Sequence, residues 1–203
     1  MNRILLTCLL LLLIAGTLTG QTADQSYTGC NLAREKAPAI RGVKLGMTAD
    51  ELYALLPAIG ESYKETMVSA GKFPRFGSVS LNAPAVDRDR FNGIESVYLQ
   101  LFDNHLVQYS VYYKGPNSAP RGPDWPNSDD LIARFADAYH LPGPANWVGD
   151  SGSKTLRCKG FEVRIGTSSG AQIMVREPGN SWVEEQKKRR EAFEEQLRRD
   201  FKP

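Results

Sequence analysis

Two histidines and three cysteines are the side chains of this sequence best suited to metal binding or nucleophilic catalysis. His105 and His140 stand apart from each other, and neither has a second ligand at the spacing of a metal site. A catalytic histidine also needs a nucleophile within hydrogen-bond reach, which the spacing of this sequence does not reveal. The sequence therefore predicts neither a metal site nor a bound cofactor, and it singles out no catalytic residue.

The acidic residues Asp87, Asp89 and Glu95 are the candidates for acid–base chemistry. Asp87 and Asp89 alternate with arginines that oppose cation binding, and the glycine and distal glutamate of a calcium loop do not follow. We interpret 87–90 as a solvated, self-paired loop. A hydrolase would need two of these acids to converge in a pocket, and this remains the alternative to a binding function.

A serine-rich segment with a glycine at each end, 166–170, has the composition of a phosphate-binding loop. Phosphate cradles use the N-terminus of a helix, whereas this segment joins two expected strands and opens no helix. We interpret it as a hairpin turn.

The N-terminus has the features of a cleavable secretory signal. Arg3 precedes 12 nearly unbroken apolar residues, 4–15, and small residues before Gln21 suit a signal peptidase, which gives a signal peptide at 1–20. The apolar run is too short for a membrane-spanning helix, which needs about 20 residues, and no later stretch comes near that length. We expect a periplasmic or extracellular mature protein with no integral membrane segment.

Cleavage would remove Cys8 and leave Cys30 and Cys158. An oxidising compartment favours their pairing, and the disulfide would constrain the unfolded chain by about 4 to 5 kcal/mol in the chain-entropy model. Two separate buried thiols are the alternative. Lipid anchoring is disfavoured because Cys8 lies inside the apolar run and the residues before Cys30 do not form a convincing lipidation motif.

The charge of the mature chain is nearly balanced. Removal of Arg3 from the 25 basic residues leaves one more basic than acidic residue, since the chain has 23 acidic ones. The basic residues are spread along the chain, with no basic block outside the mixed-charge tail. Nucleic-acid binding is therefore not expected.

Two segments have the capping patterns of helices. Thr48 and Glu51 form a capping box, and Pro57 ends an apolar face, which predicts a helix over about 49–56. A second helix is predicted to begin at 127–130, where a capping side chain precedes acidic residues, and to end at 141–143. Its apolar residues recur at helical spacing: Leu131, Ile132, Phe135, Ala136 and Tyr139.

Alternating apolar residues predict a hairpin of strands 95–102 and 106–113. A two-residue turn would put the two apolar sets on opposite faces of the sheet. A three-residue connection, 103–105, restores agreement and places His105 near the left-handed region. The resulting pairs are Leu101 with Val107, Leu99 with Tyr109 and Val97 with Val111.

These elements predict an α+β fold of two αβββ units, with the helices on one face of antiparallel sheet. Further strands are expected at 154–158, 161–165 and 171–176, and a weaker one at 78–82. The predicted organisation is a signal peptide (1–20), a first unit (21–114), a proline-rich connector (115–127), a second unit (128–178) and a charged helical tail (179–203). The tail carries an apolar stripe of Phe193, Leu197 and Phe201, typical of a lightly packed solvated helix or of an interaction arm.

The segment 40–48, with Glu51, Leu52 and Leu55, resembles the opening of the αβββ modules of the β-lactamase inhibitor protein and of the SmpA-type outer-membrane assembly lipoprotein. The resemblance implies a small exported domain whose sheet carries helices on one face and binds protein with the other. The tandem spacing is closer to that of the inhibitor. The chain lacks the lipidation motif expected of the assembly lipoprotein, and it has one candidate bridge that joins its two ends in place of a small disulfide inside each unit.

The hairpin offers a candidate protein-binding surface on the face opposite its apolar residues. We predict that it consists of Tyr98, Gln100, Phe102, Gln108 and Tyr112, since aromatic and polar groups suit such contacts. The alternative is that the tail or the second unit covers this face. We therefore expect a binding module for an envelope or extracellular protein, with an inhibitor that blocks a partner enzyme, or the hydrolase, as the other possibilities.

Overall fold

The computed structural model describes residues 29–57, 77–82, 89–117, 125, 127–168, 170–179 and 181–201. For 77–82 and 181 it describes the backbone only. The predicted signal peptide, with Cys8, and the acidic residue Asp87 lie outside the described residues. Among the helices that are described, none combines the length and the apolar character needed to cross a membrane.

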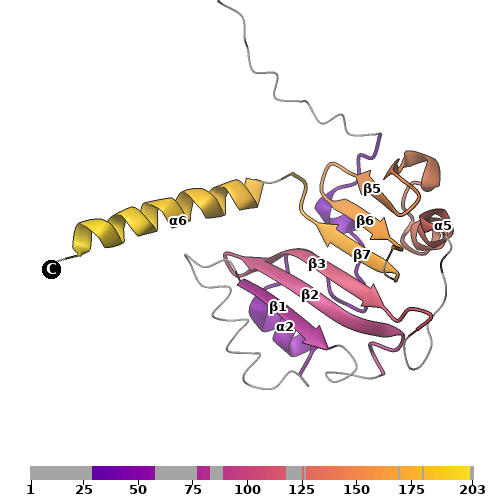
Figure 1. The fold of residues 1–203 in the computed structure, drawn as a ribbon, viewed down its shortest axis with the longest axis horizontal. Coiled ribbons are helices and arrows are strands. Elements are labelled where there is room, and N and C mark those ends of the chain that lie inside the picture. Colours follow the sequence, from indigo (N-terminus) through magenta and orange to yellow (C-terminus); the bar gives the residue numbers. More distant parts are fainter. Residues whose placement is uncertain are drawn as a thin grey trace, which may run out of the picture.

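The described chain forms one antiparallel sheet with helices, which confirms the α+β class (Figure 1). The sheet has seven strands in the order β1-β2-β3-β7-β6-β5-β4, so β3 and β7 join the strands of the two predicted units. The division into two units stays a prediction. The strands are β1 (Gly77–Asn82), β2 (Ile94–Phe102), β3 (His105–Tyr113), β4 (Val148–Gly149), β5 (Ser153–Arg157), β6 (Glu162–Gly166) and β7 (Gln172–Arg176). The helices are α2 (Ala49–Leu55), α5 (Ser128–Tyr139), α6 (Ser181–Asp200) and the short 3-10 turns η1 (Arg34–Lys36) and η2 (Pro144–Asn146).

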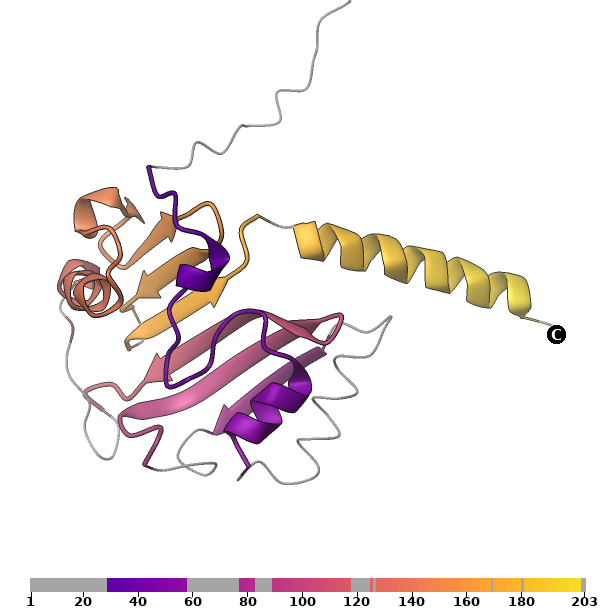
Figure 2. The same cartoon turned by 180° about the vertical axis from the view of Figure 1, so that it is seen from behind.

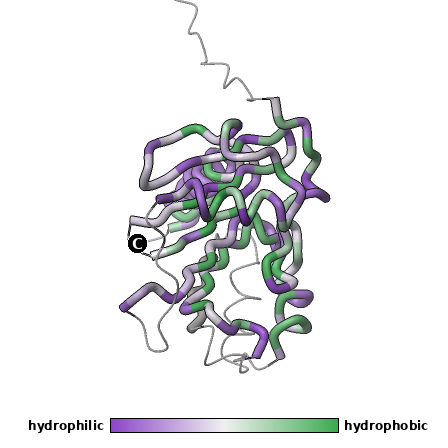
Figure 3. The backbone as a smooth tube through the Cα atoms, turned by 90° about the vertical axis from the view of Figure 1, so that its right-hand side faces the viewer, coloured by the Kyte–Doolittle hydropathy of each residue, from purple (hydrophilic) through white to green (hydrophobic). Residues whose placement is uncertain are grey.

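One face of the sheet is covered by α2, α5 and the N-terminal segment (Figure 2). The apolar residues of the strands and of these helices form a single buried cluster on that side. Hydrophobic and hydrophilic residues follow one another along the strands (Figure 3), as a sheet with one buried face requires. α6 leaves the body and carries its charged surface beyond the edge of the sheet.

Both predicted helices form where their capping residues indicate. The Thr48 N–H donates to Glu51 Oε2 at 2.7 Å, and the Glu51 N–H donates to Thr48 Oγ1 at 3.2 Å, so the capping box is confirmed. The hydrogen bonds that the N–H and the hydroxyl of Thr48 donate to the Glu51 carboxylate hold its pKa below its usual value. Asn127 Oδ1 accepts from the N–H groups of Asp129 and Asp130 at 2.9 and 3.2 Å, which starts α5 at Ser128.

The β2–β3 hairpin confirms two of the three predicted pairs and corrects its turn. Leu99 pairs with Tyr109 and Val97 with Val111, as expected. The turn has two residues, Asp103 and Asn104, both in the left-handed region with φ of 48° and 62°. Leu101 therefore pairs with Leu106, not with the following residue.

A β-bulge in β3 explains this difference. The register shifts between Gln100 and Leu101, so that Val107 pairs with no residue of β2, and the expected pairing resumes with Gln100 opposite Gln108. The prediction that His105 occupies the left-handed position was wrong, because it pairs with Phe102 at the first step of the ladder. The alternation of apolar residues requires one extra residue in the hairpin. The prediction placed this residue in the turn, whereas it is the bulged Val107 of β3.

The N-terminal segment is fixed to the strands by a disulfide and by buried hydrogen bonds. Cys30 and Cys158 form the predicted disulfide, with an S–S distance of 1.98 Å and a sequence separation of 128 residues. Tyr109, fully buried on β3, donates its hydroxyl to Pro38 O. The Gly46 N–H donates to Leu106 O at 2.8 Å. This segment therefore closes the covered face of the sheet.

We expect the protein to lose stability in alkaline solution through the tyrosines beneath this segment. Burial raises the pKa of Tyr109 strongly and raises the pKa of Tyr113 to about 12, whereas unfolded tyrosines titrate near pH 10. A tyrosine whose pKa is higher in the folded than in the unfolded protein contributes its full stability below the unfolded pKa. That stability is lost as the pH rises from about 10 towards the pKa of the folded state. Circular dichroism and tyrosinate absorbance, followed together from pH 8 to 12, should therefore show the last tyrosines ionising together with the loss of folded structure.

The variant Tyr109→Phe is the matched comparison. It removes the most strongly perturbed phenol and also the donor to Pro38 O, so it should be less stable at neutral pH and lose less stability between neutral and alkaline pH. An unchanged alkaline loss of stability in this variant would contradict the role given to Tyr109.

Candidate protein-binding surface

The face of the sheet that the helices do not cover is called here the open face. In Figure 1 it is turned to the viewer, and none of the described helices lies across it. Strand register defines its members because alternate residues point to the same side. They are Ser96, Tyr98, Gln100, Phe102, Gln108, Ser110, Tyr112, Ser153, Thr155, Arg157, Glu162, Arg164, Gly166, Gln172, Met174 and Arg176.

All five residues predicted for the binding surface lie on the open face and come from two adjacent strands. Gln100 of β2 pairs with Gln108 of β3, and the remaining three flank this pair. Tyr112 is 37% exposed, and the other four are partly buried. The sequence correctly placed these residues together, and their role in binding stays a prediction.

The tyrosine hydroxyls of this surface are tied to neighbouring glutamines. Gln100 Nε2 donates to the Tyr98 hydroxyl at 3.2 Å, and Gln172 Nε2 of β7 donates to the Tyr112 hydroxyl at 3.1 Å. Both side chains are thereby held in place before any partner arrives, which lowers the entropy lost on binding. Rigid aromatic groups with a polar end are the residues that most often dominate protein interfaces.

The other half of the open face is charged, and the sequence prediction did not include it. Glu162 is 3% exposed and accepts from Arg176 Nε at 2.7 Å, while Arg157 Nε lies 3.9 Å from its other oxygen. A buried carboxylate needs such partners, because a lone buried charge is strongly destabilising. The alternation of polar and apolar residues in β5 to β7 was a visible signal that these side chains share a face.

The tail contacts the open face at the end of the β2–β3 hairpin. Trp182 is buried at the start of α6, and Arg189 donates to Asp103 Oδ2 and to Glu185 Oε1, both at 2.6 Å. The guanidinium of Arg189 also lies over the ring of Phe102, 5.2 Å from its centroid. The tail thus partly covers Phe102, one of the five predicted residues.

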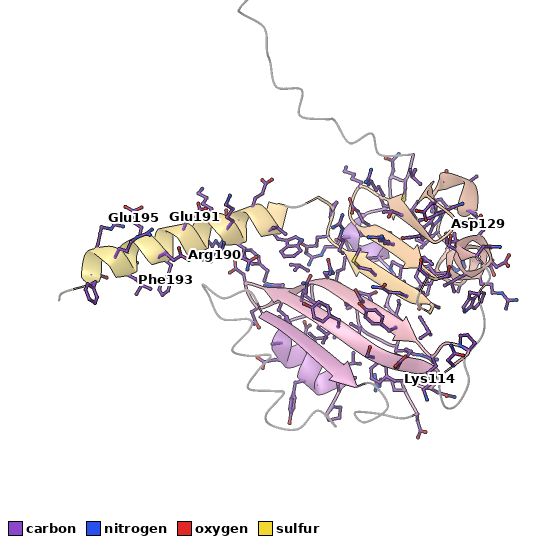
Figure 4. The ribbon with its side chains drawn as sticks, viewed as in Figure 1. Lys114, Asp129, Arg190, Glu191, Phe193 and Glu195 are labelled. Atoms are coloured by element: carbon purple, nitrogen blue, oxygen red, sulfur yellow. A yellow bond between two sulfur atoms is a disulfide. The ribbon has the colours of Figure 1, made fainter. Side chains whose placement is uncertain are left out.

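The distal half of α6 extends away from the sheet (Figure 4). The figure labels Glu191 and Glu195 on one side of this half and Phe193 on the other. The stripe predicted from the sequence is exposed, with Phe193, Leu197 and Phe201 at 43%, 54% and 74%. The tail therefore leaves most of the open face accessible.

The candidate catalytic residues remain dispersed. His105 is exposed at the start of β3, with Nδ1 2.8 Å from Asp103 O, and His140 is exposed at the end of α5 with φ of 54°. Asp89 and Glu95 are exposed as well. Over the described part of the chain, no three histidine, cysteine or acidic side chains gather as metal ligands would.

Two of the pockets lined by described residues lie on different sides of the molecule. One, of about 280 Å³, opens on the open face between β5, β6 and β7 and is called here the open-face pocket. The other, of about 360 Å³, lies beside the start of α2, where Arg34, Lys44 and Glu51 line it. Neither pocket contains Asp89 or Glu95, so neither brings together the acids that a hydrolase would use.

Comparisons with known proteins leave the resemblance to tandem αβββ modules as a prediction. Neither a protein-family model, nor a curated protein, nor a solved structure matched this chain.

Proposed function

We propose that this protein is an exported binding module that recognises another protein of the envelope or the extracellular space through its open face. The observation that carries the proposal is the asymmetry of the sheet, whose one face is buried under helices while the other presents ordered aromatic and polar side chains. The disulfide between Cys30 and Cys158 supports export, since disulfides persist in oxidising compartments.

The aromatic residues of β2 and β3 provide the contact area that such binding needs. Tyr98 and Tyr112 are each held by a glutamine amide, so they can bury ring surface without losing much rotamer freedom. Residues of this kind typically contribute at least about 2 kcal/mol each when they sit at the centre of an interface. An inhibitor would use the same surface, and only the activity of the bound partner distinguishes it from a non-inhibitory module.

We expect the double substitution Tyr98→Ala/Tyr112→Ala to abolish capture of the partner. The tagged chain, expressed with its own signal in a bacterial host and crosslinked in intact cells, should co-purify with a discrete protein. Purified partner should then bind the double variant at least about 30-fold more weakly than the unaltered chain, which is the loss of about 2 kcal/mol expected when one of the two tyrosines is an interface hot spot.

The control is Asp130→Ala/Asp137→Ala, which alters two exposed residues of α5 and should leave capture unchanged. Thermal unfolding of both variants checks that they are folded. Equal capture by the unaltered chain and by Tyr98→Ala/Tyr112→Ala would remove the open face as the binding surface.

A further inference from the structure

We propose that the open-face pocket receives an aspartate or glutamate side chain of the partner protein, with Arg164 as the group that pairs with its carboxylate. This inference rests on the proposed function, since it names the chemistry that the open face recognises. It concerns the half of the sheet that the sequence prediction left out.

The pocket exists because small residues stand where side chains would otherwise fill the surface. Its lining is Gly152, Ser153, Arg164, Gly166, Ser168, Gly170, Gln172 and Met174. A Cβ on Gly152 would come within 2.8 Å of Ser168 Oγ, and Gly170 has φ of 112°, where other residues are strained. Gly166, Ser168 and Gly170 therefore form one wall of a hollow, and the described residues of this segment open no helix.

Arg164 is the cation of this pocket, and among the described residues it has a partner that orients it but no carboxylate that neutralises it. Its Nε donates to Ser153 Oγ at 2.8 Å, which fixes the plane of the guanidinium and leaves the two terminal nitrogens for another acceptor. Within the described residues no carboxylate is paired with Arg164, whereas the neighbouring Arg176 is paired with Glu162. The terminal N–H groups of an exposed guanidinium held in this way can donate two hydrogen bonds to an anion.

The shape and charge of the pocket favour a carboxylate side chain. A guanidinium matches the two oxygens of a carboxylate, and one cation balances the single negative charge of Asp or Glu, whereas a phosphate carries about two. Met174 offers an apolar wall to the methylene groups of the entering side chain. The pocket is also continuous with the aromatic surface, because Gln172 lines it and donates to Tyr112.

A random peptide library displayed on phage and selected on the immobilised, disulfide-bonded full chain tests this inference. Selected peptides should carry an acidic residue at a fixed offset from an aromatic or apolar residue. In the best peptide, Glu→Gln or Asp→Asn should weaken binding about 10- to 100-fold, the range of a charge-assisted hydrogen bond. When binding to the Arg164→Gln variant is measured, the same change in the peptide should alter the affinity very little.

Two further variants separate this inference from the proposed function. Arg198→Gln removes an exposed arginine in the last turn of α6, away from the open face, and should preserve the acidic preference. Two results would overturn the carboxylate pocket and leave the binding surface standing, provided that the peptides lose binding to Tyr98→Ala/Tyr112→Ala. One is that these peptides show no preference for an acidic residue, and the other is that they bind Arg164→Gln as tightly as the unaltered chain. A selection that yields no peptide specific for the open face would overturn both.

Discussion

Replacement of both Cys30 and Cys158 by serine is expected to lower the free energy of unfolding by about 5 kcal/mol. The disulfide joins residues 128 positions apart, and in the chain-entropy model a loop of this length costs the unfolded state roughly that amount. The effect is comparable to the whole stability of many domains, which is about 5–15 kcal/mol. The first residues of the described chain would then detach most easily from the end of β5.

Urea unfolding of the oxidised chain, the reduced chain and the double variant measures this directly. The reduced chain and the variant should agree, and a reductant should leave the variant unaffected. A loss below about 1 kcal/mol would show that the unfolded state gains little freedom when the bridge is cut, which contradicts the entropic argument.

The second large effect is expected from Gly160→Ala, which should destabilise the protein by about 3 kcal/mol. Gly160 follows Cys158 in the turn before β6, where its N–H donates to Leu32 O at 2.9 Å. A Cβ there would lie 2.1 Å from Arg34 N and 2.5 Å from the carbonyl carbon of Ala33. These are backbone atoms, so the N-terminal segment itself would have to move away from the sheet.

Gly143→Ala is the matched control. A Cβ at Gly143 meets nothing within 4 Å, and its φ of −66° is ordinary for alanine. This change should alter the free energy of unfolding by less than about 1 kcal/mol, measured by the same urea unfolding. Equal losses in the two variants would mean that the close crossing at Gly160 does not constrain the fold.

Local signals in the sequence were sufficient for the helices and for the character of the hairpin. The capping box of Thr48 and Glu51 and the cap at Asn127 depend on residues three positions apart or fewer, so their chemistry is visible in the sequence itself. The five predicted surface residues share a face because strand side chains alternate with a period of two.

Features that depend on distant contacts could not be predicted in the same way. The position of the bulge at Val107 depends on the turn formed by Asp103 and Asn104, and either a longer turn or a bulge satisfies the same pattern. The pairing of β3 with β7, the short strand β4 and the crossing at Gly160 involve segments far apart in sequence. No local pattern distinguishes them from other arrangements.

Only the part of the candidate surface on the β2–β3 hairpin was predicted, because the rest depends on contacts between segments far apart in sequence. The hairpin of β2 and β3 has the strongest alternation, and its face was identified from that alone. Arg164 joins this surface only through β7, and Arg189 reaches Asp103 across 86 residues of chain. Polar residues of β5 to β7 gain their place on the open face from strand order, which the sequence does not specify.

A photoreactive aromatic amino acid placed at Tyr112 tests most directly whether the open face contacts another protein. In intact cells that export the chain, illumination should join Tyr112 to one discrete partner, while the same group at Asp137, exposed on α5, should not. A partner crosslinked from Asp137 but not from Tyr112 would place binding on another side of the molecule and contradict the proposed function.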